Sequence, residues 1–133
     1  MPKVVLDTNV FVSAVIGHGK PRQLLQRGID KEFTIVTSDS IIRELVTVLR
    51  RPKFKTSDDE IRRIVIGLLG ACEVVEVVSH FKAVKNDPSD NAILNTATDA
   101  GADMIVTGDK HLLVLKNFRG TSILSVSQGM KRL

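Results

Sequence analysis

Four acidic residues in this sequence stand in places that ordinary surface charge does not explain. Asp7 follows the apolar run Val4–Leu6 in VVLDTN, and Asp109 follows another apolar run in MIVTGDK. Glu44 and Asp90 fall within stretches of helical period, IIRELVTVL and DPSDNAILNTA. Because burying an ionised carboxylate without a partner is costly, each acid must either cap a helix or hold a positively charged group.

Glu44 and Asp90 can be located relative to the apolar faces of their predicted helices. At about 100° per residue, the apolar residues of IIRELVTVL form one arc, and Glu44 lies just outside its edge, beside Val48. Glu44 can therefore lean over the rim of a sheet. Asp90 falls inside the apolar arc of its own helix, with Leu94 on one side and Ala97 on the other. That is a poor place for a solvated charge.

The elements that must position these acids alternate between strands and helices. Strands are predicted at residues 3–7, 33–38, 73–78, 103–109 and 121–126, helices at 21–30, 40–51, 57–70 and 87–101, and a short tail at 127–133. Ser57 and Glu60 have capping-box spacing, Pro88 can begin its helix and Gly101 can end it. This order predicts an α/β fold with right-handed crossovers, a three-layer α/β/α sandwich around a central parallel sheet of about five strands.

Capping is the alternative explanation for the acids taken singly. Asp7 or Asn9 could cap the helix after the first strand, and Asp87 could cap the helix that begins at Pro88. Asp109 could cap a turn at Lys110, and Asp90 could interact favourably with the dipole of its helix. Capping does not explain an acid in an apolar arc or an acid in mid-helix. In the predicted sheet, moreover, Asp7 and Asp109 both lie at carboxyl ends of parallel strands, where open α/β sheets bind their ligands.

A cation would resolve the crowding of these acids. Carboxylates that converge without a cation repel one another, and hard oxygen ligands favour Mg²⁺ or Mn²⁺. The chain has one cysteine, Cys72, and no suitably spaced histidines, so a zinc site does not compete. The sequence therefore predicts a magnesium or manganese site.

The composition limits the class of protein. The chain has 133 residues, 43% of them hydrophobic and 26% charged, and we expect a single domain over residues 1–133. A formal net charge of +4 suits a polyanionic partner without requiring one. No apolar stretch approaches the ~20 residues that span a bilayer, and the N-terminus lacks a signal-peptide pattern. We expect a cytoplasmic protein with no membrane partner.

Taken together and in this order, four stretches resemble the PIN domain family in its small single-domain bacterial and archaeal form: LDTNVFVSA, IIRELVTVL, DPSDNAILNTA and MIVTGDKHLL. The resemblance covers essentially the whole chain. It implies a sheet ordered 3-2-1-4-5 and metal-dependent ribonuclease activity, often as the toxin of a toxin–antitoxin pair. Carried over residue by residue, it places the catalytic and metal-binding acids at Asp7, Glu44, Asp90 and Asp109.

Further polar residues follow from the same resemblance. Asn9 and Thr107 match accessory positions that would orient ligands or waters, and Asp87 is an extra acid at the rim. The third and fourth motifs, DPSDNAI and TGDKHLL, depart from the best-known toxins of the family and resemble a neighbouring subgroup.

The expected chemistry is hydrolysis of RNA phosphodiester bonds with Mg²⁺ or Mn²⁺ as cofactor. One or two cations would lower the pKa of a bound water and neutralise charge on the departing oxygen, leaving 5′-phosphate and 3′-hydroxyl ends. Asp7 is the first candidate for direct contact, with Asp90 and Asp109 beside it, and Glu44 would bind through water.

Basic residues around the acids would bind the RNA backbone. Lys110 follows Asp109 directly, and the densest basic segment is RRPKFK, which contributes Arg50, Arg51, Lys53 and Lys55 around Phe54. The alternative for RRPKFK is a solvated loop between two helices.

The competing interpretation of the whole chain is a non-catalytic RNA- or protein-binding module on the same fold, with the acids reduced to caps. His18, His80 and His111 could in principle support RNA cleavage without metal, although no pairing among them is visible. Besides the RNA substrate, the partners that the resemblance implies are an antitoxin protein and a second copy of the chain.

Overall fold

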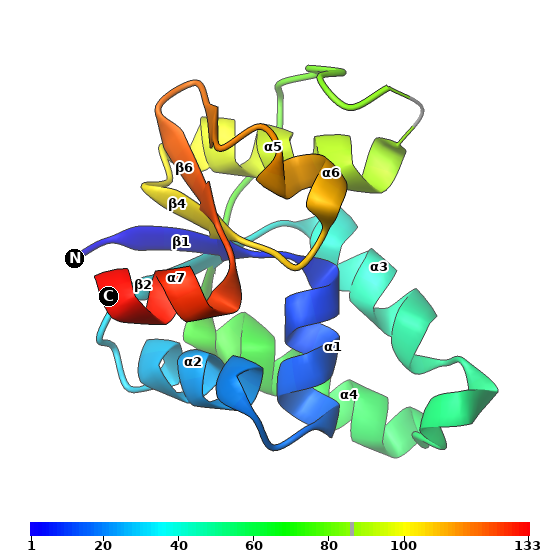
Figure 1. Cartoon of the computed structure of the whole chain (residues 1–133). Helices are drawn as coiled ribbons and strands as arrows, with labels where there is room; N and C mark the ends of the chain where they lie inside the picture. Colours follow the sequence, from blue (N-terminus) through cyan, green and yellow to red (C-terminus); the bar gives the residue numbers. More distant parts are fainter. Residues whose placement is uncertain (86) are drawn as a thin grey trace.

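A largely parallel sheet with helices on both faces organises the chain (Figure 1). The computed structural model describes residues 1–85 and 87–133. Its strands are β1 (Lys3–Leu6), β2 (Thr34–Thr37), β3 (Cys72–Val74), β4 (Met104–Val106), β5 (Asn117–Phe118) and β6 (Thr121–Leu124). They lie in the order β3-β2-β1-β4-β6-β5; the first five of this order pair in parallel, and β5 pairs with β6 antiparallel.

The predicted strand order 3-2-1-4-5 is confirmed, with β6 in the place of the fifth strand. The prediction of about five parallel strands missed β5, a two-residue antiparallel strand at the edge. This strand forms because Arg119 and Gly120 both adopt positive φ, 49° and 89°, in a two-residue hairpin turn. Arginine rarely adopts that conformation, so the sequence pattern did not reveal the turn.

The helices are α1 (Thr8–Ile16), α2 (Lys20–Ile29), α3 (Asp39–Leu49), α4 (Asp58–Ala71), α5 (Pro88–Ala100), α6 (Lys110–Leu113) and α7 (Val126–Arg132), with a 3-10 turn η1 (Pro52–Phe54). Figure 1 shows α5 on one face of the sheet and α2 and α7 on the other, so the three-layer prediction is confirmed. Within residues 1–85 and 87–133, none of the helices combines the length and apolarity needed to cross a bilayer.

Residues 127–133, expected as a tail, belong mostly to α7 instead. Ser125 and Gln128 form a reciprocal capping box, in which each side chain bonds the backbone N–H of the other. Gly129 packs so closely on Val106 that an added Cβ would lie 2.9 Å from a methyl group of that valine. The absence of a side chain at 129 therefore lets α7 lie against β4.

The third strand is shorter than the expected 73–78. After β3 the N–H of Val75 still donates to the carbonyl of Thr37 at 2.9 Å. Asp99 of α5 then accepts a hydrogen bond from the N–H of Val78 at 2.7 Å. This bond draws the chain away from the sheet and onto α5, so the apolar alternation of the segment overstated its strand.

Asp7 and Thr107 follow the two central strands, β1 and β4, at the same edge of the sheet. Leu6 of β1 pairs with Val106 of β4, and both are fully buried. The next residue on each strand is still bonded to a neighbouring strand: Asp7 N–H donates to the carbonyl of Val106 at 3.0 Å, and Thr107 N–H to that of Leu124 at 2.9 Å. Asp7 and Thr107 therefore leave the sheet side by side.

Candidate metal centre

Three carboxylates converge where α5 and α6 begin. One oxygen from each of Asp87, Asp90 and Asp109 lies within 4.8 Å of the other two. Asp87 precedes α5, Asp90 lies in its first turn, and Asp109 precedes α6 just beyond β4. We call these three residues the acidic cluster.

The capping alternative is confirmed for two members of the acidic cluster. Oδ1 of Asp87 accepts a hydrogen bond from the N–H of Asp90 at 3.0 Å, and Oδ1 of Asp109 accepts one from the N–H of His111 at 2.8 Å. Each cap occupies one oxygen of the carboxylate and fixes its orientation. Capping and cation binding are therefore compatible, because a carboxylate has two oxygens.

Asp7 does not cap α1 with its side chain, although its backbone begins that helix. Its Oδ2 instead accepts a hydrogen bond from the hydroxyl of Thr107 at 2.6 Å. The same hydroxyl oxygen accepts from the N–H of Asp109 at 3.0 Å. Asp7 is 6% exposed and Thr107 fully buried, so one buried hydroxyl ties the end of β1 to the start of α6.

The pKa of Asp7 is raised above its ordinary value. Burial is the largest cause, and the negative charge of Asp109 adds to it, while the hydrogen bond from Thr107 acts in the opposite direction. Asp7 therefore belongs to the same electrostatic site as the acidic cluster.

Asp90 is the most strongly perturbed acid of the site. It is 4% exposed, and within the described parts of the chain its Oδ2 is buried without a hydrogen-bond partner. Burial raises its pKa to about 8, with Asp109 and then Asp87 contributing in the same direction. An unpartnered, buried carboxylate oxygen between two other carboxylates is the donor arrangement that a hard divalent cation satisfies.

The remaining predicted acid, Glu44, lies near the acidic cluster but outside it. It is half-buried on α3 and lines a hollow of about 170 Å³ together with Thr8, Pro88 and Ser89, among others. Its neighbours thus include the residue after Asp7 and the first turn of α5. A contact through water, as predicted for Glu44, is compatible with this position.

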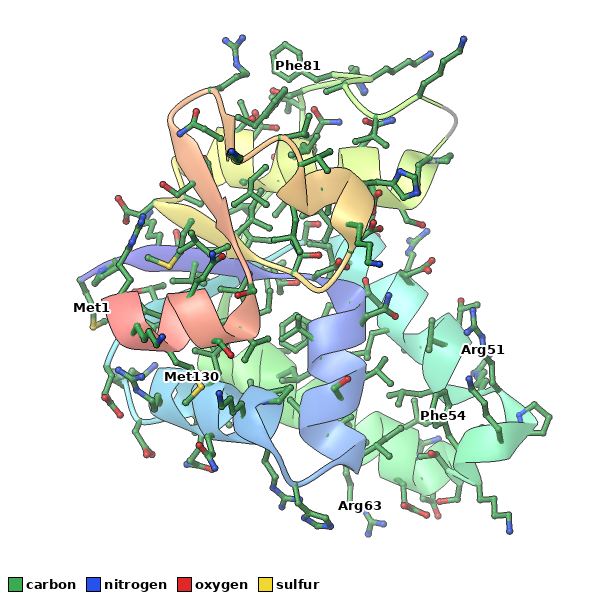
Figure 2. The ribbon with its side chains drawn as sticks, in the orientation of Figure 1. Met1, Arg51, Phe54, Arg63, Phe81 and Met130 are labelled. Atoms are coloured by element: carbon green, nitrogen blue, oxygen red, sulfur yellow. The ribbon has the colours of Figure 1, made fainter. Side chains whose placement is uncertain are left out.

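Asn9 and Lys110 flank the site from the first turns of α1 and α6, and both are exposed. The segment RRPKFK lies at the opposite end of α3 from Ser40, where Figure 2 shows Arg51 and Phe54. Its four predicted RNA-binding residues, Arg50, Arg51, Lys53 and Lys55, are exposed around η1, and the ammonium of Lys53 lies 5.0 Å from the centre of the Phe54 ring. The structure does not bring this segment to the acidic cluster, and its role in RNA binding stays a prediction.

Asp87, predicted as an extra acid at the rim, is a member of the acidic cluster, whereas Asp7, the first candidate for direct contact with a cation, is not. The signal was present in the sequence. Asp87 and Asp90 are three residues apart at a helix start, and residues at that spacing share a face of the helix. The interpretation of Asp87 as a cap of α5 is confirmed.

Comparison with known proteins reveals both a family and a fold. Residues 3–111 match the model of the PIN domain. The uncharacterized protein MJ1680 of Methanocaldococcus jannaschii is 31% identical over 119 residues, which cover 86% of this chain and 76% of that protein.

Similar folds occur among solved structures. VapBC2 from Rickettsia felis, bound to a DNA fragment from its promoter, has a TM-score of 0.66 at 17% identity, covering 92% of this chain and 98% of that chain. PAE2754 from Pyrobaculum aerophilum has a TM-score of 0.66 at 16% identity, covering 99% and 88%. The PIN domain of T. brucei RRP44 has a TM-score of 0.51 at 16% identity, covering 98% and 78%. At these identities the likeness concerns the fold.

Proposed function

Because the chain belongs to the PIN domain family, we propose that it is a metal-dependent endoribonuclease acting at the acidic cluster. The observation that carries the proposal is the group of three carboxylates, with the buried Oδ2 of Asp90 lacking a partner within the described residues. Capping explains Asp87 and Asp109 but leaves this oxygen unexplained. Mg²⁺ or Mn²⁺, when bound, would supply a polarised water and positive charge for the scissile phosphate.

Some side chains would bind the cation, and others would orient those ligands or the bound waters. Asp90 and Asp109 would hold it together with Asp87, and Asp7 would complete the set from the end of β1. Thr107 holds the carboxylate of Asp7 by its 2.6 Å hydrogen bond, so the carboxylate is oriented before a ligand arrives. Glu44 and Asn9 would orient waters at the edge.

The proton on Asp90 links cation binding to pH. With a pKa of about 8, this carboxyl holds a proton near neutral pH, and it must give up that proton to act as a ligand. Affinity for the cation should therefore increase as pH rises through this value.

The test is cleavage of a labelled single-stranded or loop-containing RNA by the purified protein. We expect cleavage with Mn²⁺ or Mg²⁺, none in EDTA, and a loss of at least about 100-fold in Asp7→Asn, Asp90→Asn and Asp109→Asn. Asp58→Asn, which changes an exposed acid at the start of α4, is the matched control and should cleave normally. Undiminished cleavage in EDTA would exclude the metal mechanism and favour the histidines.

A non-catalytic binding module on the same fold is the second candidate, because two of the acids do act as caps. The two candidates differ in their response to a divalent cation. A nuclease site should be stabilised by Mn²⁺ alone, whereas acids that serve only as caps should not.

We also propose a protein partner of the antitoxin kind and a homodimer. The support for the protein partner is the likeness in fold to VapBC2, whose solved structure is bound to a DNA fragment from the promoter. The homodimer is what the resemblance to the PIN domain family implies. Cells expressing the wild-type chain should stop growing, and those expressing Asp90→Asn should not. Sedimentation of the purified protein tests the dimer.

A further inference from the structure

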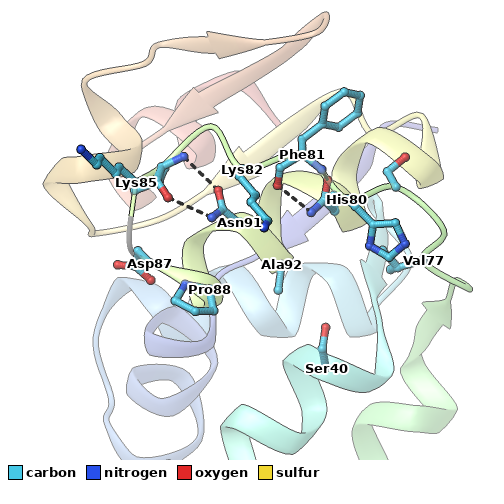
Figure 3. Close-up of a pocket in the computed structure, with 13 residues that line it drawn as sticks. Ser40, Val77, His80, Phe81, Lys82, Lys85, Asp87, Pro88, Asn91 and Ala92 are labelled. Atoms are coloured by element: carbon cyan, nitrogen blue, oxygen red, sulfur yellow. Dashed lines mark hydrogen bonds between the residues drawn. The ribbon is translucent and has the colours of Figure 1, made fainter.

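We propose that a trough beside the acidic cluster holds a single strand of RNA; this inference rests on the proposed nuclease function. The trough consists of two hollows that share Ser40, Pro88 and Ala92. The larger, of about 680 Å³, lies between the segment 77–85 and helices α3 and α5 (Figure 3). The smaller, of about 170 Å³, contains Glu44.

The trough reaches one member of the acidic cluster. Asp87 lines the larger hollow and is a member of the acidic cluster. Thr8, which directly follows Asp7, lines the smaller hollow. A chain lying along the trough would therefore pass the carboxylates that are proposed to hold the cation.

One wall of the trough is held rigidly by α5. The side-chain amide of Asn95 accepts from the N–H of Phe81 at 2.8 Å and donates to its carbonyl at 3.1 Å. One helical turn earlier, the amide of Asn91 makes the same pair of bonds with Val84, both at 2.9 Å (Figure 3). The wall therefore exists before a ligand binds, which lowers the entropic cost of binding.

These hydrogen bonds favour a nucleic acid over a peptide as the occupant. An extended peptide gains affinity by pairing with free backbone N–H and C=O groups. At Phe81 and Val84 both of these groups are already bonded to asparagine side chains. A nucleic acid needs no such groups, because it binds through its phosphates and base faces.

The side chains of the larger hollow suit a polynucleotide. Lys82, Lys85 and His80 bring basic groups to it, and both lysines are exposed. Val77 and Ala92 are among its apolar lining residues, which can receive the flat faces of bases. Figure 3 shows Ala92 of α5 facing Ser40 of α3 across the hollow.

The occupant should be single-stranded. The volume of about 680 Å³ falls within the range of pockets that enclose small ligands, so it suits a few unpaired nucleotides. A duplex keeps its bases stacked and paired, and it would expose only its backbone to the trough.

The first test measures RNA binding in EDTA, so that cleavage does not enter. The probe is a short fluorescein-labelled polyuridine strand, and a hairpin duplex serves as competitor. We expect Lys82→Ala combined with Lys85→Ala to weaken binding about tenfold near 0.1 M salt and to reduce the salt slope by about 1.4, the value for two phosphate contacts on a single strand. The hairpin should compete poorly.

The matched control for charge is Arg63→Ala combined with Lys131→Ala, which removes two exposed cations from α4 and α7. This pair should leave the salt slope nearly unchanged. Equal losses in both double variants, or wild-type binding in the first, would overturn the proposal.

The second test fills the trough. Ala92→Phe places a ring where both hollows meet, and it should reduce polyuridine binding at least tenfold while Mn²⁺ still raises the melting temperature. Wild-type RNA binding by a folded Ala92→Phe would exclude occupation of the trough. Absence of cleavage with normal, trough-dependent RNA binding would instead exclude the nuclease and leave the trough intact.

Discussion

The buried carboxyl of Asp90 lies against Asp87 and Asp109, and its Oδ2 has no hydrogen-bond partner within the described residues. Such an arrangement is unfavourable to the folded protein when no cation is bound, because ionisation is opposed by burial and by like charge. Functional sites often carry this kind of local instability. The consequence can be measured as stability, independently of activity.

Asp90→Asn should stabilise the metal-free protein. The amide carries no charge and needs no proton, so the variant avoids the cost of keeping this buried acid between two carboxylates, and we expect the free energy of unfolding in EDTA at pH 7.5 to rise by about 1 to 2 kcal/mol. In the control Asp58→Asn, loss of an exposed acid at a helix start should instead lower it by about 0.3 to 1 kcal/mol. Urea denaturation gives both values; a destabilised Asp90→Asn would contradict the crowded site.

The pH dependence of stability follows from the same residue. The folded-state pKa of Asp90, about 8, exceeds its ordinary value of 3.8, so the folded state binds a proton that the unfolded state has lost. Stability should therefore be greatest near and below pH 4 as far as Asp90 is concerned, and its contribution should be lost as pH rises toward and through 8. Between pH 5.5 and 7.5 the wild type should lose about 1 to 2.5 kcal/mol more than Asp90→Asn. Parallel curves for the two proteins would exclude the raised pKa.

A substitution at Thr107 tests whether the orientation of the Asp7 carboxylate matters, because it removes no charged group. Thr107→Val keeps the shape of the side chain but removes the hydroxyl that bonds Asp7 and the N–H of Asp109. We expect activity to fall about 10- to 100-fold, as for other groups that orient metal ligands. Thr107→Ser should retain most of it, and equal activity in the valine and serine variants would show that the hydroxyl does not matter.

Among the elements, helix α5 both positions acids of the acidic cluster and holds the segment 78–84. Its N-terminal end carries Asp87 as the capping residue and Asp90 in the first turn, and its later turns hold the segment 78–84 through Asn91, Asn95 and Asp99. These polar residues lie on a helix whose apolar side covers the sheet. The helix therefore connects the acidic cluster and the wall of the trough as one body.

Asn95→Ala should loosen that wall without unfolding the sheet. Both hydrogen bonds to Phe81 are lost, so amide hydrogen exchange should accelerate in residues 78–84 while β1 and β4 stay protected. Asn95→Asp keeps the acceptor but not the donor and should have an intermediate effect. Uniform acceleration across the whole chain would indicate global destabilisation instead.

Most of the elements could be predicted because local signals and burial agree for them. The capping box of Ser57 and Glu60 and the stop at Gly101 depend on neighbouring residues alone, and both are confirmed. The early end of β3 depends on Asp99, more than twenty residues away. A pattern read along the chain does not contain such a contact.

The site was predictable in part for the same reason. Asp7 and Asp109 follow apolar strands, and a parallel sheet brings such positions to one edge. That Asp87 lies closer to Asp90 and Asp109 than Glu44 does depends on side-chain directions at helix starts. Those directions come from packing in three dimensions.

For the molecule as a whole, a divalent cation should act as a stabilising ligand. Mn²⁺ at about 100 times its dissociation constant should add about 2.7 kcal/mol to the free energy of unfolding. The melting temperature should therefore rise with Mn²⁺ in the wild type and not in Asp90→Asn or Asp109→Asn. Glu44→Gln should keep most of the shift, since Glu44 lies outside the acidic cluster. An equal shift in all variants would place the cation elsewhere.

Since α5 carries both Asp90 and the asparagines that hold the wall, one helix sets the distance between the acidic cluster and the wall of the trough. Asn95 lies five residues after Asp90, which corresponds to about 7.5 Å along the axis, and α5 runs without interruption between them. This fixed spacing would determine which phosphate of an RNA bound in the trough lies at the acidic cluster. Cleavage sites would then be set by the register of the RNA in the trough, without any closing movement of the protein.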